Sequence, residues 1–77
     1  MTELLLLDAN AQSEGVITRI DQGRPEQVSK LMALGLTPGR KIRIHQTQPQ
    51  FIISIENTLL GFDAEMASSI YFTPVSS

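Results

Sequence analysis

The spacing of hydrophobic residues changes from three to two near the middle of the chain. Val28, Leu31 and Leu34 recur at every third position, which places them on one face of a helix. Between residues 41 and 46 apolar residues alternate with charged or polar ones, which is typical of a strand with one buried face. The pattern predicts a helix that leads almost directly into a strand. The core side chains expected from this pair are Leu31, Leu34, Ile42 and Ile44.

The residues between the helix and the strand are those that a tight reversal requires. Gly35 stands where a helix ends in the left-handed conformation, which costs a non-glycine residue about 1–2 kcal/mol. Leu36 is placed to fold back onto the helix as the apolar contact of such a cap. Pro38 and Gly39 fit the central pair of a type II turn, in which proline presets the first φ and glycine supplies the positive second φ. This stretch is interpreted as scaffold.

Four other short apolar runs, each bounded by turn residues, are predicted to be strands: residues 16–20, 51–55, 59–62 and 70–72. In the first of these, alternation places Ile17 and Arg19 on the face opposite to Ile20. Pro25 is expected at the first helical position, and Asp63 is expected to cap a single helical turn before the last strand. About five strands, with one helix between the first two clear ones, predict a mainly β fold that closes into a small antiparallel barrel.

All 77 residues are assigned to one small domain. Its core is expected from about residue 14 to residue 73, with residues 1–13 as a strand or loop that covers the core and residues 74–77 as a polar tail. The apolar run near the start covers only residues 4–7 and follows an acidic residue, which fits neither a membrane span nor a signal peptide. A cytoplasmic location is therefore predicted.

The composition argues against catalysis. The chain has no cysteine, so it has neither a disulfide nor a thiolate that could act as a nucleophile or metal ligand. Its single histidine, His45, has no neighbouring partner that resembles an acid–base relay. The protein is therefore predicted not to be an enzyme.

No metal ligand or cofactor is assigned. His45 is expected to face outward beside Lys41 and Arg43, where positive charge disfavours a bound cation. No paired spacing typical of metal ligands is present. A weak surface site for ferrous iron or another divalent metal remains as an alternative, and its candidate ligands are Glu56, Asp63 and Glu65.

The distribution of charge suggests a docking surface. The net charge of −2 argues against nucleic-acid binding. All six basic residues nevertheless lie between positions 19 and 43. Three of them, Arg40, Lys41 and Arg43, are predicted to share a solvent-facing side after the turn. The alternatives are a docking face for an acidic partner surface and an ordinary solvated face.

A second candidate surface is apolar. Alternation in residues 51–55 turns Ile52 outward, and Leu59 is expected to face outward on the next strand. The two side chains are expected to form an apolar patch across the hairpin. Residues 4–7 are predicted to cover this patch, and the alternative is that it contacts a partner or mediates weak self-association.

Motifs along most of the chain resemble the FeoA family (ferrous iron transport protein A) in order and spacing. They are Gly15-Val16-Ile17, then Leu31 with Leu34-Gly35-Leu36-x-Pro38-Gly39-x-x-Ile42-x-Ile44, then Leu60-Gly61-Phe62, Ala67 and Ile70-x-Phe72. The resemblance implies an SH3-like β-barrel. It also implies a non-enzymatic accessory role in ferrous iron uptake, through protein–protein contact with FeoB, the membrane GTPase that carries ferrous iron, on its cytoplasmic side.

The residues proposed for that contact are Arg40, Lys41, Arg43, Ile52 and Leu59. The same domain resembles the C-terminal domain of iron- or manganese-dependent repressors. The alternative function is therefore a metal-responsive accessory module of that kind.

Overall fold

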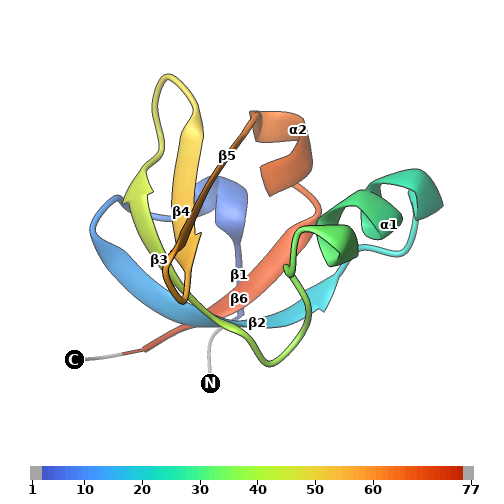
Figure 1. Cartoon of the computed structure of the whole chain (residues 1–77), viewed down its shortest axis with the longest axis horizontal. Coiled ribbons are helices and arrows are strands. Elements are labelled where there is room, and N and C mark those ends of the chain that lie inside the picture. The colour runs from blue at the N-terminus through green and yellow to red at the C-terminus, as the bar shows by residue number, and fades with distance from the viewer. Residues whose placement is uncertain (1–2, 76–77) are drawn as a thin grey trace.

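The computed structural model describes residues 3–75. Its strands are β1 (Leu4–Leu5), β2 (Ser13–Ile20), β3 (Lys41–Gln46), β4 (Phe51–Ile55), β5 (Thr58–Phe62) and β6 (Ile70–Pro74). Its helices are the 3-10 helix η1 (Leu6–Asp8), α1 (Pro25–Ala33) and α2 (Ala64–Ala67). The strands form one antiparallel sheet in the order β1-β6-β2-β3-β4-β5, which curves strongly while α1 projects from one end (Figure 1). The predicted mainly β fold with a helix after the first long strand is confirmed, and β1 is an additional edge strand.

The inner face of the curved sheet holds the apolar core. On β4 the alternation is regular, since Phe51 and Ile53 are buried while Ile52 is half-buried on the other side, as predicted. The rings of Phe51 and Phe62 stack with their centroids 6.1 Å apart, which joins β4 to β5. The buried hydrophobic residues are Leu6, Ile17, Ile20, Leu31, Leu36, Ile42, Ile44, Phe51, Ile53, Ile55, Phe62, Ala67, Ile70 and Phe72.

The end of α1 is a Schellman cap. Gly35 has a φ of +90°, its N–H donates to the Met32 carbonyl at 3.0 Å, and the Leu36 N–H donates to the Leu31 carbonyl at 2.9 Å. Leu36 is fully buried against the helix, and Gly39 in the following turn has a φ of +94°. The predicted helix end and turn are confirmed.

The predicted core position of Leu34 is wrong, because its side chain is 44% exposed. Each step of three residues rotates a helical side chain about 60° short of a full turn, so the second step from Val28 carries Leu34 out of the buried face. Leu36, brought back by the cap, is buried instead.

A β-bulge interrupts β2. Ile17 lies opposite Phe72 and Arg19 lies opposite Tyr71, so Thr18 is an extra residue on β2. Ile17 and Ile20 are both buried, whereas strict alternation placed them on opposite faces. That prediction is wrong because the extra residue reverses the alternation along the rest of the strand.

The N-terminal segment does not cover the patch predicted for it. β1 pairs with β6, with Leu4 opposite Phe72, and Leu6 is fully buried in the core. β1 and β5 stand at opposite ends of the strand order, and Leu59 on β5 is 66% exposed. The apolar side chains of this segment pack against β6 and in the core, so Leu59 in the Ile52–Leu59 patch stays exposed to solvent.

No helix in the described part of the chain has the length and apolar character needed to cross a membrane.

Candidate partner-binding surface

The strand register brings the predicted surface residues into one row. Glu14 on β2 lies opposite Arg43 on β3, Arg43 lies opposite Ser54 on β4, and Ser54 lies opposite Leu59 on β5. Lys41 is two residues from Arg43 and therefore points to the same side. We call this side of the sheet the outer face, and its residues are Glu14, Lys41, Arg43, Ile52, Ser54 and Leu59.

The cations of the outer face are paired with carboxylates. Lys41 Nζ lies 3.7 Å from one oxygen of Glu14, and Arg43 Nη1 lies 3.6 Å from the other. At the neighbouring turn, Arg40 Nη1 donates to Glu56 Oε1 at 2.6 Å. Arg40, Lys41 and Arg43 are thus close together, but three cations share two carboxylates and leave one excess positive charge. Exposed pairs of this kind contribute about 0–1 kcal/mol each, so their partners exchange readily.

A shallow depression of about 470 Å³ lies between these side chains and β4. Its rim carries the three cations together with Glu14 and Glu56, and Ser54 lines it from β4. A carboxylate from another protein entering here would compete with Glu14 and Glu56 for the same cations.

The apolar part of the outer face lies beside the charged part. Leu59 neighbours Ser54, and Ile52 lies opposite Gly61. Ile52 and Leu59 are therefore diagonal neighbours, not directly opposite, and only Leu59 is largely exposed. The largest apolar contact that this face offers a partner is the Leu59 side chain.

His45 lies on the outward side of β3, as predicted, and is half-buried. A register shift between Ile44 and Gln46 sets its position, and its Nε2 lies 2.9 Å from Ser54 Oγ in a hydrogen bond. This hydrogen bond links β3 to β4 and engages the imidazole nitrogen that faces the neighbouring strand.

The carboxylates considered for a metal site are separated, and each has its own partner. Glu56 pairs with Arg40, Asp63 Oδ1 accepts from the Met66 N–H at 3.0 Å, and Glu65 lies 3.5 Å from Arg24. Among residues 3–75, no three side chains of histidine, aspartate or glutamate come together as ligands for one ion. Asp63 therefore caps the N-terminus of α2, as predicted.

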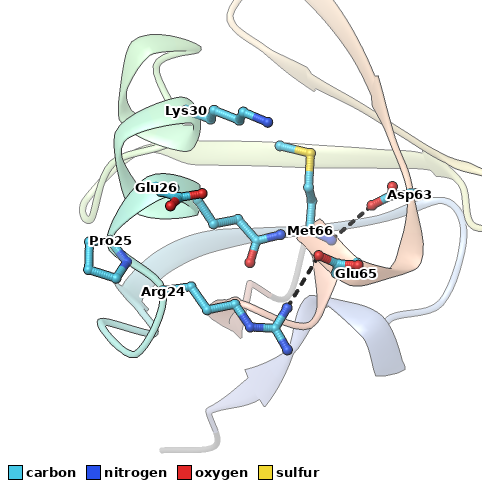
Figure 2. Close-up of a pocket in the computed structure, with 8 residues that line it drawn as sticks. Arg24, Pro25, Glu26, Lys30, Asp63, Glu65 and Met66 are labelled. Carbon is cyan, nitrogen blue, oxygen red and sulfur yellow. Dashed lines mark hydrogen bonds and ion pairs between the residues drawn. The ribbon is translucent and has the colours of Figure 1, made fainter.

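A groove between α1 and α2 was not predicted from the sequence. Its volume is about 390 Å³, and Figure 2 shows Arg24 and Lys30 reaching across it toward Glu65 and Met66. Gln27, which lines the groove, accepts a hydrogen bond through Oε1 from the buried Ser69 hydroxyl at 2.7 Å. The groove depends on packing between segments about forty residues apart in sequence, and no local pattern indicates such packing. Its charges are mixed, and Arg24 is already paired with Glu65.

The comparison with protein families decides the affiliation of the chain. The FeoA domain matches residues 4–74, which is nearly the whole sequence. The chain belongs to the FeoA family. Membership implies an accessory role in ferrous iron uptake. No curated protein matches the sequence.

Solved structures share the fold. A crystal structure of an iron uptake regulatory protein (FeoA) matches with a TM-score of 0.87 and 21% identity, covering 97% of this chain and 100% of that one. A FeoA-like protein from Clostridium acetobutylicum matches with a TM-score of 0.88 and 18% identity, covering 100% and 93%. These values confirm the SH3-like FeoA fold.

A manganese-dependent transcriptional repressor in complex with manganese has a TM-score of 0.90. It shares 13% identity, and the match covers 97% of this chain but only 38% of the repressor. At this identity the likeness shows the fold alone.

Proposed function

We propose that this FeoA-family protein is a non-enzymatic, cytoplasmic accessory protein of ferrous iron uptake that acts by binding the cytoplasmic side of FeoB. Family membership supports the assignment of the protein to ferrous iron uptake. The observation that supports the binding surface is the position of Leu59, which is 66% exposed and lies in one cross-strand row with Ser54 and Arg43. A leucine this exposed beside exchangeable charges is suited to a protein partner.

The two halves of the outer face have different roles in the proposed contact. Full burial of a leucine side chain contributes about 1.5–3 kcal/mol, so Leu59 supplies affinity. Arg40, Lys41 and Arg43 exchange Glu14 and Glu56 for carboxylates of the partner, which mainly raises the association rate and makes it depend on salt. Ile52, diagonal to Leu59, extends the apolar contact.

The test is a titration of the folded protein with the cytoplasmic region of FeoB at low and high salt. The double variant Lys41→Glu/Arg43→Glu is expected to bind at least about tenfold more weakly at low salt, a loss that shrinks as salt screens the charges. Leu59→Ser is expected to weaken binding at both salt concentrations.

The matched control is Arg24→Glu/Lys30→Glu, which reverses the same number of charges in the groove between α1 and α2. It is expected to bind as the unmodified protein does. Absence of binding at low salt would overturn the proposed function, and an equal loss in the control variant would overturn the assignment of the surface.

A further inference from the structure

β5 is an edge strand with an exposed leucine and without charge or proline. Within residues 3–75 it pairs only with β4 and stands at one end of the strand order. Its sequence, Thr58-Leu59-Leu60-Gly61-Phe62, contains no charge and no proline. Charges, prolines and very short length are the devices that normally keep edge strands from pairing with other chains. The opposite edge, β1, is only two residues long.

The register shows which backbone groups of β5 remain free. Glu56 and Asn57 form the turn between Ile55 and Thr58, which lie opposite each other. The pair that closes a two-residue turn is hydrogen-bonded, and hydrogen-bonded pairs then alternate along an antiparallel ladder. Thr58, Leu60 and Phe62 therefore bond to β4. Leu59 and Gly61 direct their N–H and C=O groups away from β4, toward the open edge.

The side chains at this edge are complementary to themselves. Leu59 is large and exposed, whereas Gly61 has no side chain, and Leu60 stands midway between them. If a second β5 runs antiparallel with Leu60 opposite Leu60, each Leu59 lies opposite the Gly61 of the other copy. The two residues then form hydrogen-bonded pairs in both directions. The leucine packs over the glycine toward Ile52 once the flexible end of Gln50, which lies beside Gly61, turns aside.

The same alignment avoids repulsion at the ends of the strand. Asp63, which follows β5, comes opposite the neutral Asn57 of the other copy, so the flanking acids do not meet. The strand itself is uncharged, so no like charges face each other across the pair.

We propose that β5 pairs with β5 of a second copy of this chain, antiparallel and centred on Leu60, to join two sheets into one. A five-residue edge gives a small interface, so the dimer is weak and forms only at high protein concentration. The proposal goes beyond the proposed function and does not depend on FeoB. Because it covers Leu59, self-pairing and the FeoB contact exclude each other.

Amide hydrogen exchange of the isolated protein tests the pairing residue by residue. The amides of Leu59 and Gly61 are expected to exchange at least about tenfold more slowly at about 1 mM protein than at about 10 μM, because only the dimer bonds them. The amides of Thr58 and Leu60 already bond to β4 and provide the internal reference. Sedimentation across the same range is expected to show a monomer becoming a dimer.

Leu59→Lys introduces a charge at the edge and is expected to keep the protein monomeric at about 1 mM, with no concentration-dependent protection. The control is Leu34→Lys, which adds the same charge at another exposed leucine and leaves the dimer intact. A wild-type protein that stays monomeric at about 1 mM would overturn the proposal. So would a dimer with unprotected Leu59 and Gly61 amides, equal disruption by Leu34→Lys, or protection that arises only when FeoB is added.

Discussion

The guanidinium carbon of Arg19 lies 3.8 Å from the centre of the Tyr71 ring. The same guanidinium donates through Nε to Glu3 Oε1 at 3.0 Å, and the Thr18 hydroxyl donates to Glu3 Oε2 at 2.6 Å. Thr18 and Arg19 are consecutive yet both exposed, because the bulge in β2 lies between Ile17 and Arg19. The bulge thus places Thr18 and Arg19 where they bind Glu3 beside the β2–β6 pair.

The hydrogen bond from the Thr18 hydroxyl is the main cause that lowers the pKa of Glu3; partial loss of hydration opposes it, and the hydrogen bond and charge of Arg19 each lower this pKa by a smaller amount. Since the folded pKa is below the unfolded one, the contribution of Glu3 to stability is present above the unfolded pKa and is lost as the pH falls through the folded pKa. Thr18→Val is expected to raise the pKa of Glu3, as measured by carboxyl NMR titration. Thr58→Val, remote in the sheet order, should leave it unchanged, and an unchanged value in Thr18→Val would contradict the assignment.

Gly35→Ala tests the cap of α1. Open space surrounds the position where a Cβ would stand, so the cost arises from the φ of +90° alone. A loss of about 1–2 kcal/mol in the free energy of unfolding is expected from urea titration. Gly23→Ala is the matched control, because the φ of Gly23 lies outside the left-handed region and a Cβ there meets only the flexible Asp21 carboxylate. Equal losses of stability in the two variants would show that the positive φ of Gly35 does not contribute the expected cost.

Leu31→Ala and Leu34→Ala separate the core from the surface of α1. Leu31 is fully buried, and its truncation is expected to cost about 2–5 kcal/mol in the free energy of unfolding. Leu34 is 44% exposed, and its truncation is expected to cost less than about 1 kcal/mol. Chemical denaturation of both variants measures the difference, and equal losses would return Leu34 to the core.

Gly15→Ala probes the close approach of β2 to β6. A Cβ at Gly15 would collide with the Phe72 ring and lie 2.7 Å from the Thr73 carbonyl oxygen. Such overpacking is expected to cost about 1–3 kcal/mol in the free energy of unfolding, visible as a lower melting temperature. At Gly61 the nearest atom is the flexible end of Gln50, at 2.9 Å, so Gly61→Ala should be milder. A larger loss of stability in Gly61→Ala than in Gly15→Ala would show that β2 and β6 can move apart without a cost in free energy.

The sequence predicts this fold well where a local steric requirement decides the conformation. Gly35 is expected to have a positive φ, and Asp63 is expected to cap the helix that follows it. The structure shows both features. The bounds of β3 follow from alternation of apolar and polar residues, and those of β4 from a short apolar run, each bounded by turn residues. These features depend on neighbours along the chain, which the sequence displays directly.

Features that depend on distant partners were not predictable in this way. The sequence around Thr18 does not indicate the bulge, because the extra residue is defined only by the pairing of β2 with β6. The predicted cations of the outer face do lie together, but their pairing with Glu14 and Glu56 requires the register of the sheet. The groove between α1 and α2 likewise exists only once α2 lies beside α1.

The segment that carries α1 leaves the sheet after Ile20 and rejoins it beside Ile17. The Gly39 N–H donates to the Ile17 carbonyl at 2.7 Å, and the Ile17 N–H donates to the Arg40 carbonyl at 2.9 Å. The ladder between β2 and β3 is therefore closed across the base of the excursion, and the number of residues above that base does not set the strand register. The exposed turn at residues 21–24 is consequently a place where a peptide tag or a fluorescent label can be grafted while every strand keeps its partner.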